Sequence, residues 1–147
     1  MARRRVRGLF KAAPLVKLLE RVGVTRASVI RVTGPGSLSP LLWLCRHGFQ
    51  QVGYVRAGEG WPHEEPDAIL AAHTCNELDL KRLLAVARQV RAGGVFLFQV
   101  RTDGGTDLLA IEWMLGAAGF EIARRLEGGH RALFVARRRA IAIQKAA

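Results

Sequence analysis

The sequence has few of the features that mark cysteine-rich, metal-binding or membrane-spanning proteins. It contains two cysteines, Cys45 and Cys75, without CxxC spacing or clustered histidines. This pattern argues against a disulfide framework and a zinc site, and we expect both thiols to be reduced and buried in a cytoplasmic protein. No apolar run reaches the roughly 18 residues of a membrane-spanning helix, and no apolar segment follows the N-terminal arginines as in a secretion signal.

Acidic residues are also scarce, because 12 Asp and Glu stand against 23 Lys and Arg, giving a formal net charge of +11. Arginines gather near both ends, at Arg3, Arg4, Arg5 and Arg7 and at Arg137, Arg138 and Arg139. Two explanations remain open, a nucleic-acid partner or solvated tails in a chain with GC-rich coding composition. Few aromatic residues separate the arginines, so no surface for base stacking is indicated. We expect a flexible basic arm at 1–12, one domain at 13–138 and a tail at 139–147.

The most informative segment joins a β-branched apolar run, 28–33, to the turn Gly34-Pro35-Gly36 and then to a helical pattern. Strand, glycine turn and helix in this order are typical of the nucleotide-binding corner of an open α/β sheet. There the turn and the N-terminus of the helix can present N–H groups to a polar ligand. An ordinary strand-to-helix turn is the alternative interpretation.

The remaining elements are predicted from hydrophobic periodicity and from glycine, proline and capping signals. Trp43 and Trp113 lie on apolar stripes of their helices and are predicted to be core residues. The alternation of strands and helices predicts an α/β fold with three layers and a mostly parallel sheet, ending in an antiparallel hairpin around the Gly-rich segment 127–130. We expect helices at 14–22, 39–47, 77–91 and 107–118, and strands at 28–33, 51–55, 68–72, 95–100, 120–126 and 131–136.

Three stretches together resemble class I S-adenosylmethionine-dependent methyltransferases. The first is the glycine turn, 32–36. The second runs from Pro66-Asp67 through a buried strand and a helix to Gly93-Gly94 and the next strand, and the third from Met114 through Ala118-Gly119-Phe120 to the closing hairpin. The resemblance covers about residues 14–138 and implies a Rossmann-like methyltransferase fold with S-adenosylmethionine as cofactor.

The resemblance also implies where the cofactor would bind and where the chemistry would occur. His73, which follows the third strand, is a candidate general base because imidazole titrates near neutral pH. Alternatively, His73 and Asn76 complete the strand end and cap the next helix. Trp61 could stack on adenine or fill a core edge, and no metal site is indicated. The candidate cofactor-binding residues are Thr33, Gly34, Pro35, Gly36, Tyr54, Ala72 and His73.

The sequence also departs from the pattern of this family. Its members usually carry an acid at the end of the second strand to bind the ribose hydroxyls, whereas this strand ends in Tyr54-Val55-Arg56 and arginine has no acceptor. Only residues 56–66 link this strand to the next, where the family has a helix, a strand and a helix. We therefore predict a trimmed sheet of about six strands, with an exposed edge that favours a homo-oligomer.

Three functions follow as hypotheses. The first is an S-adenosylmethionine-dependent methyltransferase acting on a small molecule or RNA, and the second is a non-catalytic methyltransferase-fold interaction module with an eroded cofactor site. The third is a basic protein that binds nucleic acid through its arginine clusters. The expected partners are a second copy of the chain or a nucleic acid, not a membrane, and the substrate stays open.

Overall fold

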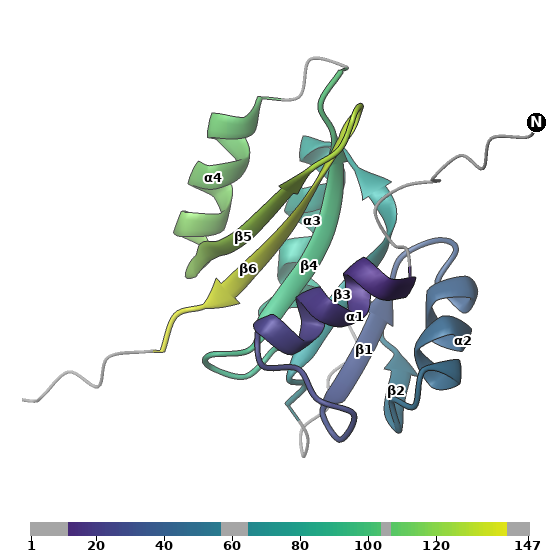
Figure 1. Ribbon diagram of the computed structural model, residues 1–147. Helices are drawn as coiled ribbons and strands as arrows, with labels where there is room; N and C mark the ends of the chain where they lie inside the picture. Colours follow the sequence, from purple (N-terminus) through teal and green to yellow (C-terminus); the bar gives the residue numbers. More distant parts are fainter. Residues whose placement is uncertain (1–11, 57–64, 104–106, 141–147) are drawn as a thin grey trace, which may run out of the picture.

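A computed structural model of the chain describes residues 12–56, 65–103 and 107–140, which form a single mixed sheet with helices on both sides (Figure 1). The strand order is β2-β1-β3-β4-β6-β5. Strands β1 to β4 are parallel, and β6 runs antiparallel to both of its neighbours, as predicted. The helices are α1 (Ala12–Arg21), α2 (Leu38–Arg46), α3 (Glu77–Ala87) and α4 (Leu108–Ala117), and the strands are β1 (Val29–Thr33), β2 (Gln51–Tyr54), β3 (Ala68–Cys75), β4 (Val95–Arg101), β5 (Phe120–Glu127) and β6 (Arg131–Arg138).

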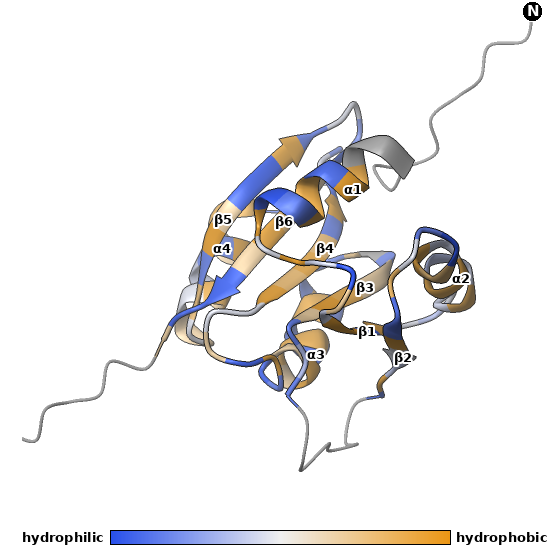
Figure 2. Cartoon of the chain, turned by 60° about the horizontal axis from the view of Figure 1, so that its bottom comes forward, coloured by the Kyte–Doolittle hydropathy of each residue, from blue (hydrophilic) through white to orange (hydrophobic). Residues whose placement is uncertain are grey.

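The helices form two layers, each of which covers a separate part of the hydrophobic core. Helices α1 and α2 pack on one face of the sheet, where Leu19 and Leu44 meet Ile30 and Leu70. Helices α3 and α4 cover the other face, which is rich in aromatic residues such as the stacked pair Phe98 and Phe134. The central strands β3 and β4 are predominantly hydrophobic, whereas the edge strand β5 is largely hydrophilic (Figure 2). This confirms the predicted α/β fold with a six-stranded sheet.

The sheet is trimmed as expected, because β2 and β5 are its edges in the described part of the chain. The link from β2 to β3 is short in sequence. Its residues 57–64, which include Trp61, lie outside the described residues. Residues 1–11, 104–106 and 141–147 also lie outside them, so the predicted basic arm is not described. None of the helices in the described ranges has both the length and the apolar character to cross a membrane.

Two element ends differ from the predictions for identifiable reasons. Strand β3 continues to Cys75 instead of ending at residue 72, and its register against β4 shifts between Leu70 and Thr74. Helix α3 ends at Ala87 instead of residue 91. The backbone N–H of Arg91 donates to the carbonyl oxygen of Pro66 rather than continuing the helix. This bond ties the end of the α3 segment to the start of β3.

The structure corrects two predictions about burial. Trp113 was predicted in the core, but it is 74% exposed. Ile111 and Leu115, four residues apart on α4, face the sheet, so a residue midway between them points to the opposite side of the helix. Cys45 is exposed rather than buried, whereas Cys75 is buried as expected. Trp43, on α2, is partly buried and packs against the core.

The second arginine cluster is largely part of the fold. The guanidinium of Arg137 donates to the carbonyl oxygens of Gly93 and Val22, at 2.7 Å and 3.2 Å, and Arg138 donates to that of Val90. These carbonyls lie at the ends of helical segments, where the backbone lacks partners within its own helix. The two arginines therefore satisfy the protein's own backbone, which weakens the prediction that this cluster binds nucleic acid.

Candidate functional site

The carboxyl ends of β1, β2 and β3 meet at one rim of the sheet, beside α3, and enclose a cavity of about 350 Å³. This volume falls within the range of about 300–1,000 Å³ that is typical of small-molecule sites. Five of the predicted site residues line it, which are Thr33, Gly34, Pro35, Tyr54 and His73. The sequence prediction did not include the other five lining residues, which are Arg56, Asp79, Arg82, Leu83 and Val86.

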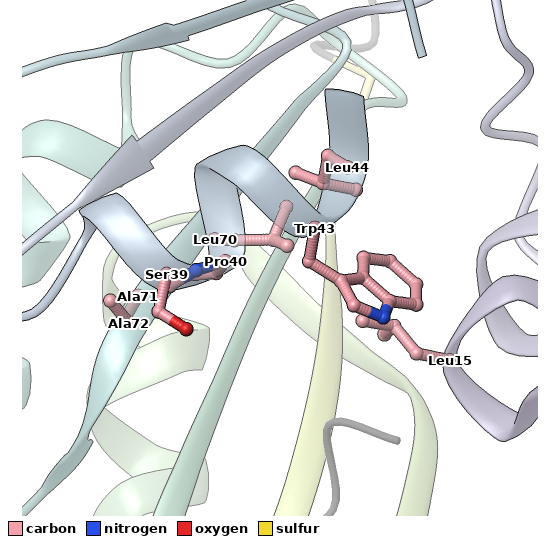
Figure 3. A pocket seen from close by; sticks show the side chains of 8 residues that line it. All are labelled: Leu15, Ser39, Pro40, Trp43, Leu44, Leu70, Ala71 and Ala72. Atoms are coloured by element: carbon pink, nitrogen blue, oxygen red, sulfur yellow. The ribbon is translucent and has the colours of Figure 1, made fainter. Parts of the chain in front are cut away.

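Two predicted site residues do not line this cavity. Ala72 lines a smaller cavity of about 110 Å³ between α1, α2 and β3, where the only polar side-chain groups are the Ser39 hydroxyl and the Trp43 indole (Figure 3). Gly36 has a positive φ of 78°, but its Cα faces open space among the described residues. We therefore place the candidate site at the larger, more polar cavity.

The glycine turn is in direct contact with His73. A methyl group built on Gly34 would lie 2.5 Å from Nδ1 and 2.8 Å from Cε1 of the imidazole, and the φ of Gly34 is 95°. The hydroxyl of Ser37 donates to the carbonyl oxygen of Gly34 and closes the turn. The imidazole thus occupies the space that glycine leaves open. Glycine is required here for contact with a side chain of the protein itself.

His73 and Asn76 have different roles at the end of β3. Asn76 is the N-cap of α3: its Oδ1 accepts from the backbone N–H of Asp79 at 2.8 Å, and Asp79 Oδ2 accepts from that of Asn76 at 3.2 Å. This reciprocal capping box confirms the structural interpretation for Asn76. The Nδ1 atom of His73 is buried and has no hydrogen-bond partner within the described ranges. His73 is therefore not a helix cap, and its Nδ1 is buried against Gly34.

Cys75 is a potential nucleophile near the rim. Its Sγ lies 4.0 Å from Nε2 of His73. Burial, together with the nearby charge of Asp79, raises the pKa of the thiol to about 12. The thiol is accordingly protonated at neutral pH, and only the thiolate is a strong nucleophile. Cys75 is a core residue rather than a catalytic one.

The cavity wall carries more positive than negative charge. Arg56 follows β2, where its guanidinium lies 5.8 Å from the ring centroid of Tyr54, and Arg82 projects from α3. Asp79 is the one carboxylate among the lining residues. The sequence shows of Arg56 only that it offers no acceptor to ribose. Arg82 is exposed to solvent as well as lining the cavity.

A signal for the missed residues is present in the sequence. Asp79, Arg82, Leu83 and Val86 have the spacing i, i+3, i+4 and i+7, which places them on one face of a helix. This face mixes charged and apolar side chains, as ligand sites do. No three metal-ligating side chains lie together in the part of the chain that the structure describes.

No model of a protein family matches this sequence, and no curated protein matches it. Solved structures do match. The ribosomal protein L11 methylase from Lactobacillus delbrueckii subsp. bulgaricus is 16% identical, with 90% of this chain and 80% of that chain covered and a TM-score of 0.65. The chain has the class I methyltransferase fold.

Two further solved structures share the class I methyltransferase fold. The sugar N-methyltransferase KedS8 from Streptoalloteichus sp. ATCC 53650 is 15% identical, with 95% of this chain and 98% of that chain covered and a TM-score of 0.63. Magnesium protoporphyrin IX methyltransferase from Synechocystis PCC 6803, solved with bound SAH, is 14% identical, with coverages of 84% and 80% and a TM-score of 0.59. At these identities the similarity establishes the fold.

The residues at the cavity differ from those that the resemblance implied for S-adenosylmethionine. The ring of His73 fills the space beside Gly34. Arg56 stands where the family's ribose-binding acid is expected, and it offers only hydrogen-bond donors. The cavity retains the position of the site in the class I methyltransferase fold, but its chemical groups differ.

Proposed function

We propose that this chain is a methyltransferase-like binding protein that holds a small molecule in the rim cavity without transferring a methyl group. The observation that carries the proposal is the contact of His73 with Gly34, which fills the cofactor's approach to the turn. The cavity beside this contact still has the volume of a ligand site. In this proposal the fold serves as a scaffold, since a fold can be retained while its function changes.

A second candidate is S-adenosylmethionine binding in support of methyl transfer. It is favoured by the glycine turn, which lies at the rim of the sheet with a positive φ at Gly34. The similar magnesium protoporphyrin IX methyltransferase was solved with bound SAH, which adds support. For the cofactor to reach the turn in this chain, the imidazole of His73 would have to move away from Gly34.

Isothermal titration calorimetry of the full chain with S-adenosylmethionine and S-adenosylhomocysteine separates the two candidates. Under our proposal the wild-type protein gives no heat at millimolar ligand. The His73→Ala variant opens the space beside Gly34, and Asn76→Ala serves as the matched control at the same strand end. Micromolar binding of either ligand by the wild-type protein would overturn the non-catalytic proposal in favour of the second candidate.

A further inference from the structure

Arg82 is exposed to solvent and also lines the rim cavity. It shares the α3 face of Asp79, Leu83 and Val86, all of which line the cavity. It makes no hydrogen bond or ion pair with another residue in the described ranges. A guanidinium beside a partly enclosed space interacts strongly with an anion, because the protein wall lowers the local dielectric constant.

A second guanidinium reinforces the positive character of the cavity, because Arg56 lines it from the end of β2. Asp79 opposes the two guanidinium groups, but its Oδ2 already accepts from the backbone N–H of Asn76. The formal net charge of +11 adds a long-range potential that attracts anions to the molecule.

We propose that the rim cavity binds a phosphate-bearing small molecule, with Arg82 and Arg56 as the phosphate-binding residues. The inference rests on the proposed function, since it names the ligand class of the same cavity. A guanidinium presents planar N–H donors that match the oxygens of a phosphate. In other nucleotide-binding α/β folds, an acid at the second strand binds ribose hydroxyls, whereas an arginine nearby accommodates a phosphate.

The uncharged part of the wall fits the remainder of such a ligand. Pro35, Leu83 and Val86 supply apolar surface, and Tyr54 supplies an aromatic ring that is 41% exposed. Apolar walls with a few convergent polar groups are typical of small-molecule sites. A positively charged sulfonium, by contrast, gains nothing from two guanidinium groups. The same residues thus favour a ligand with an anionic group such as a phosphate.

The test compares three probes by isothermal titration calorimetry on the full chain: adenosine 5′-monophosphate, adenosine and inorganic phosphate. We expect the monophosphate to bind at least about tenfold more tightly than adenosine, because hydrogen bonds to charged groups contribute roughly that factor. The affinity for inorganic phosphate, compared with that for the monophosphate, distinguishes a simple anion site from a site that also binds the nucleoside part. Arg82→Gln should weaken binding of the monophosphate about tenfold or more.

Arg88→Gln is the matched control, because Arg88 is an exposed arginine that caps the same helix but does not line the cavity. Equal losses in Arg82→Gln and Arg88→Gln would overturn the inference in favour of general attraction to a basic surface. Equal affinity for the monophosphate and adenosine would overturn it while leaving the proposed ligand cavity intact. Absence of heat with all three probes overturns the inference, whereas micromolar binding of S-adenosylmethionine or S-adenosylhomocysteine by the wild-type protein overturns the proposed function instead.

Discussion

The imidazole of His73 fills the space that a side chain at Gly34 would occupy, since a methyl group there would lie 2.5 Å from Nδ1. This contact joins the β1–α2 turn to the end of β3, two segments almost 40 residues apart in sequence. Position 34 requires glycine for two reasons, the contact with His73 and the positive φ of 95°. Substitutions can separate the effect of the contact from that of the backbone conformation.

Gly34→Ala should lower the free energy of unfolding by about 2–5 kcal/mol, from left-handed backbone strain plus overpacking against His73. Gly36→Ala is the matched control, because Gly36 has a φ of 78° but open space around it, and it should cost about 1–2 kcal/mol from strain alone. Urea unfolding measures both. If Gly34→Ala lowers the free energy of unfolding by the same amount in a His73→Ala background, the steric clash with His73 does not contribute and this explanation is wrong.

Asp67→Ala should destabilise the junction between β1, β3 and the segment after α3. The Asp67 carboxylate accepts from the backbone N–H of Val29 at 2.7 Å and from Nε of Arg91. Removing both acceptors leaves a part-buried N–H unsatisfied, for an expected loss of about 2–3 kcal/mol in urea unfolding. Asp103→Ala, whose ion-pair partners are exposed, should lower the free energy of unfolding much less than Asp67→Ala. Equal losses for the two variants would contradict this assignment.

The two cysteines should differ sharply in reactivity. At pH 8 a thiol reagent should label Cys45, which is exposed, at once, and Cys75 only after unfolding, because burial raises the pKa of Cys75 from 9.0 to about 12. Absorbance of the released reagent anion, in a Cys45→Ser variant, isolates the buried thiol. Rapid labelling of Cys75 in the folded variant would show that this end of β3 is open to solvent.

The same pKa shift sets a pH dependence for stability. Between about pH 9 and pH 12 the unfolded chain loses the Cys75 proton while the folded chain keeps it. The contribution of Cys75 to stability is therefore complete below pH 9 and declines as the pH rises through this window. The difference in unfolding free energy between wild type and Cys75→Ala, measured by urea titration across this window, should shrink with rising pH. A constant difference would contradict the burial of the thiol.

Trp113→Ala should change the free energy of unfolding by less than about 0.5 kcal/mol, because most of this side chain is in contact with solvent. Phe120→Ala, at a core position 1% exposed, should cost about 3–5 kcal/mol. Urea midpoints compare the two. Light scattering after size exclusion shows whether Trp113 contributes to self-association. If the protein is monomeric and Trp113→Ala still lowers the free energy of unfolding strongly, the exposed position of Trp113 is wrong.

The order of elements could be predicted because most of them carry clear local signals. The run Val95–Val100 is apolar at nearly every position, and Gly93-Gly94 precedes it, as expected for a strand buried on both faces. Asn76 with Asp79 three residues later predicts the start of α3, and the structure confirms this start through the capping box. Such signals depend on near neighbours in the chain, which a sequence shows directly.

The errors arose where the outcome depends on tertiary packing. Helix α4 is apolar on nearly all sides, so its periodicity could not show that Ile111 faces the sheet while Trp113 and Leu109 face solvent. The contribution of Arg82 to the cavity depends on how α3 packs beside the carboxyl ends of β1, β2 and β3. Neither fact is encoded in the residues adjacent to these positions.

The position of β6 between β4 and β5 has a consequence for synthesis of the protein. Since β6 follows β5 along the chain, β5 leaves the ribosome before the strand that pairs with it. β4 likewise remains a bare edge until the same moment, when one late segment forms backbone bonds with both. A nascent chain that stalls before β6 therefore exposes two unpaired strand edges at once, which makes it a substrate for chaperones.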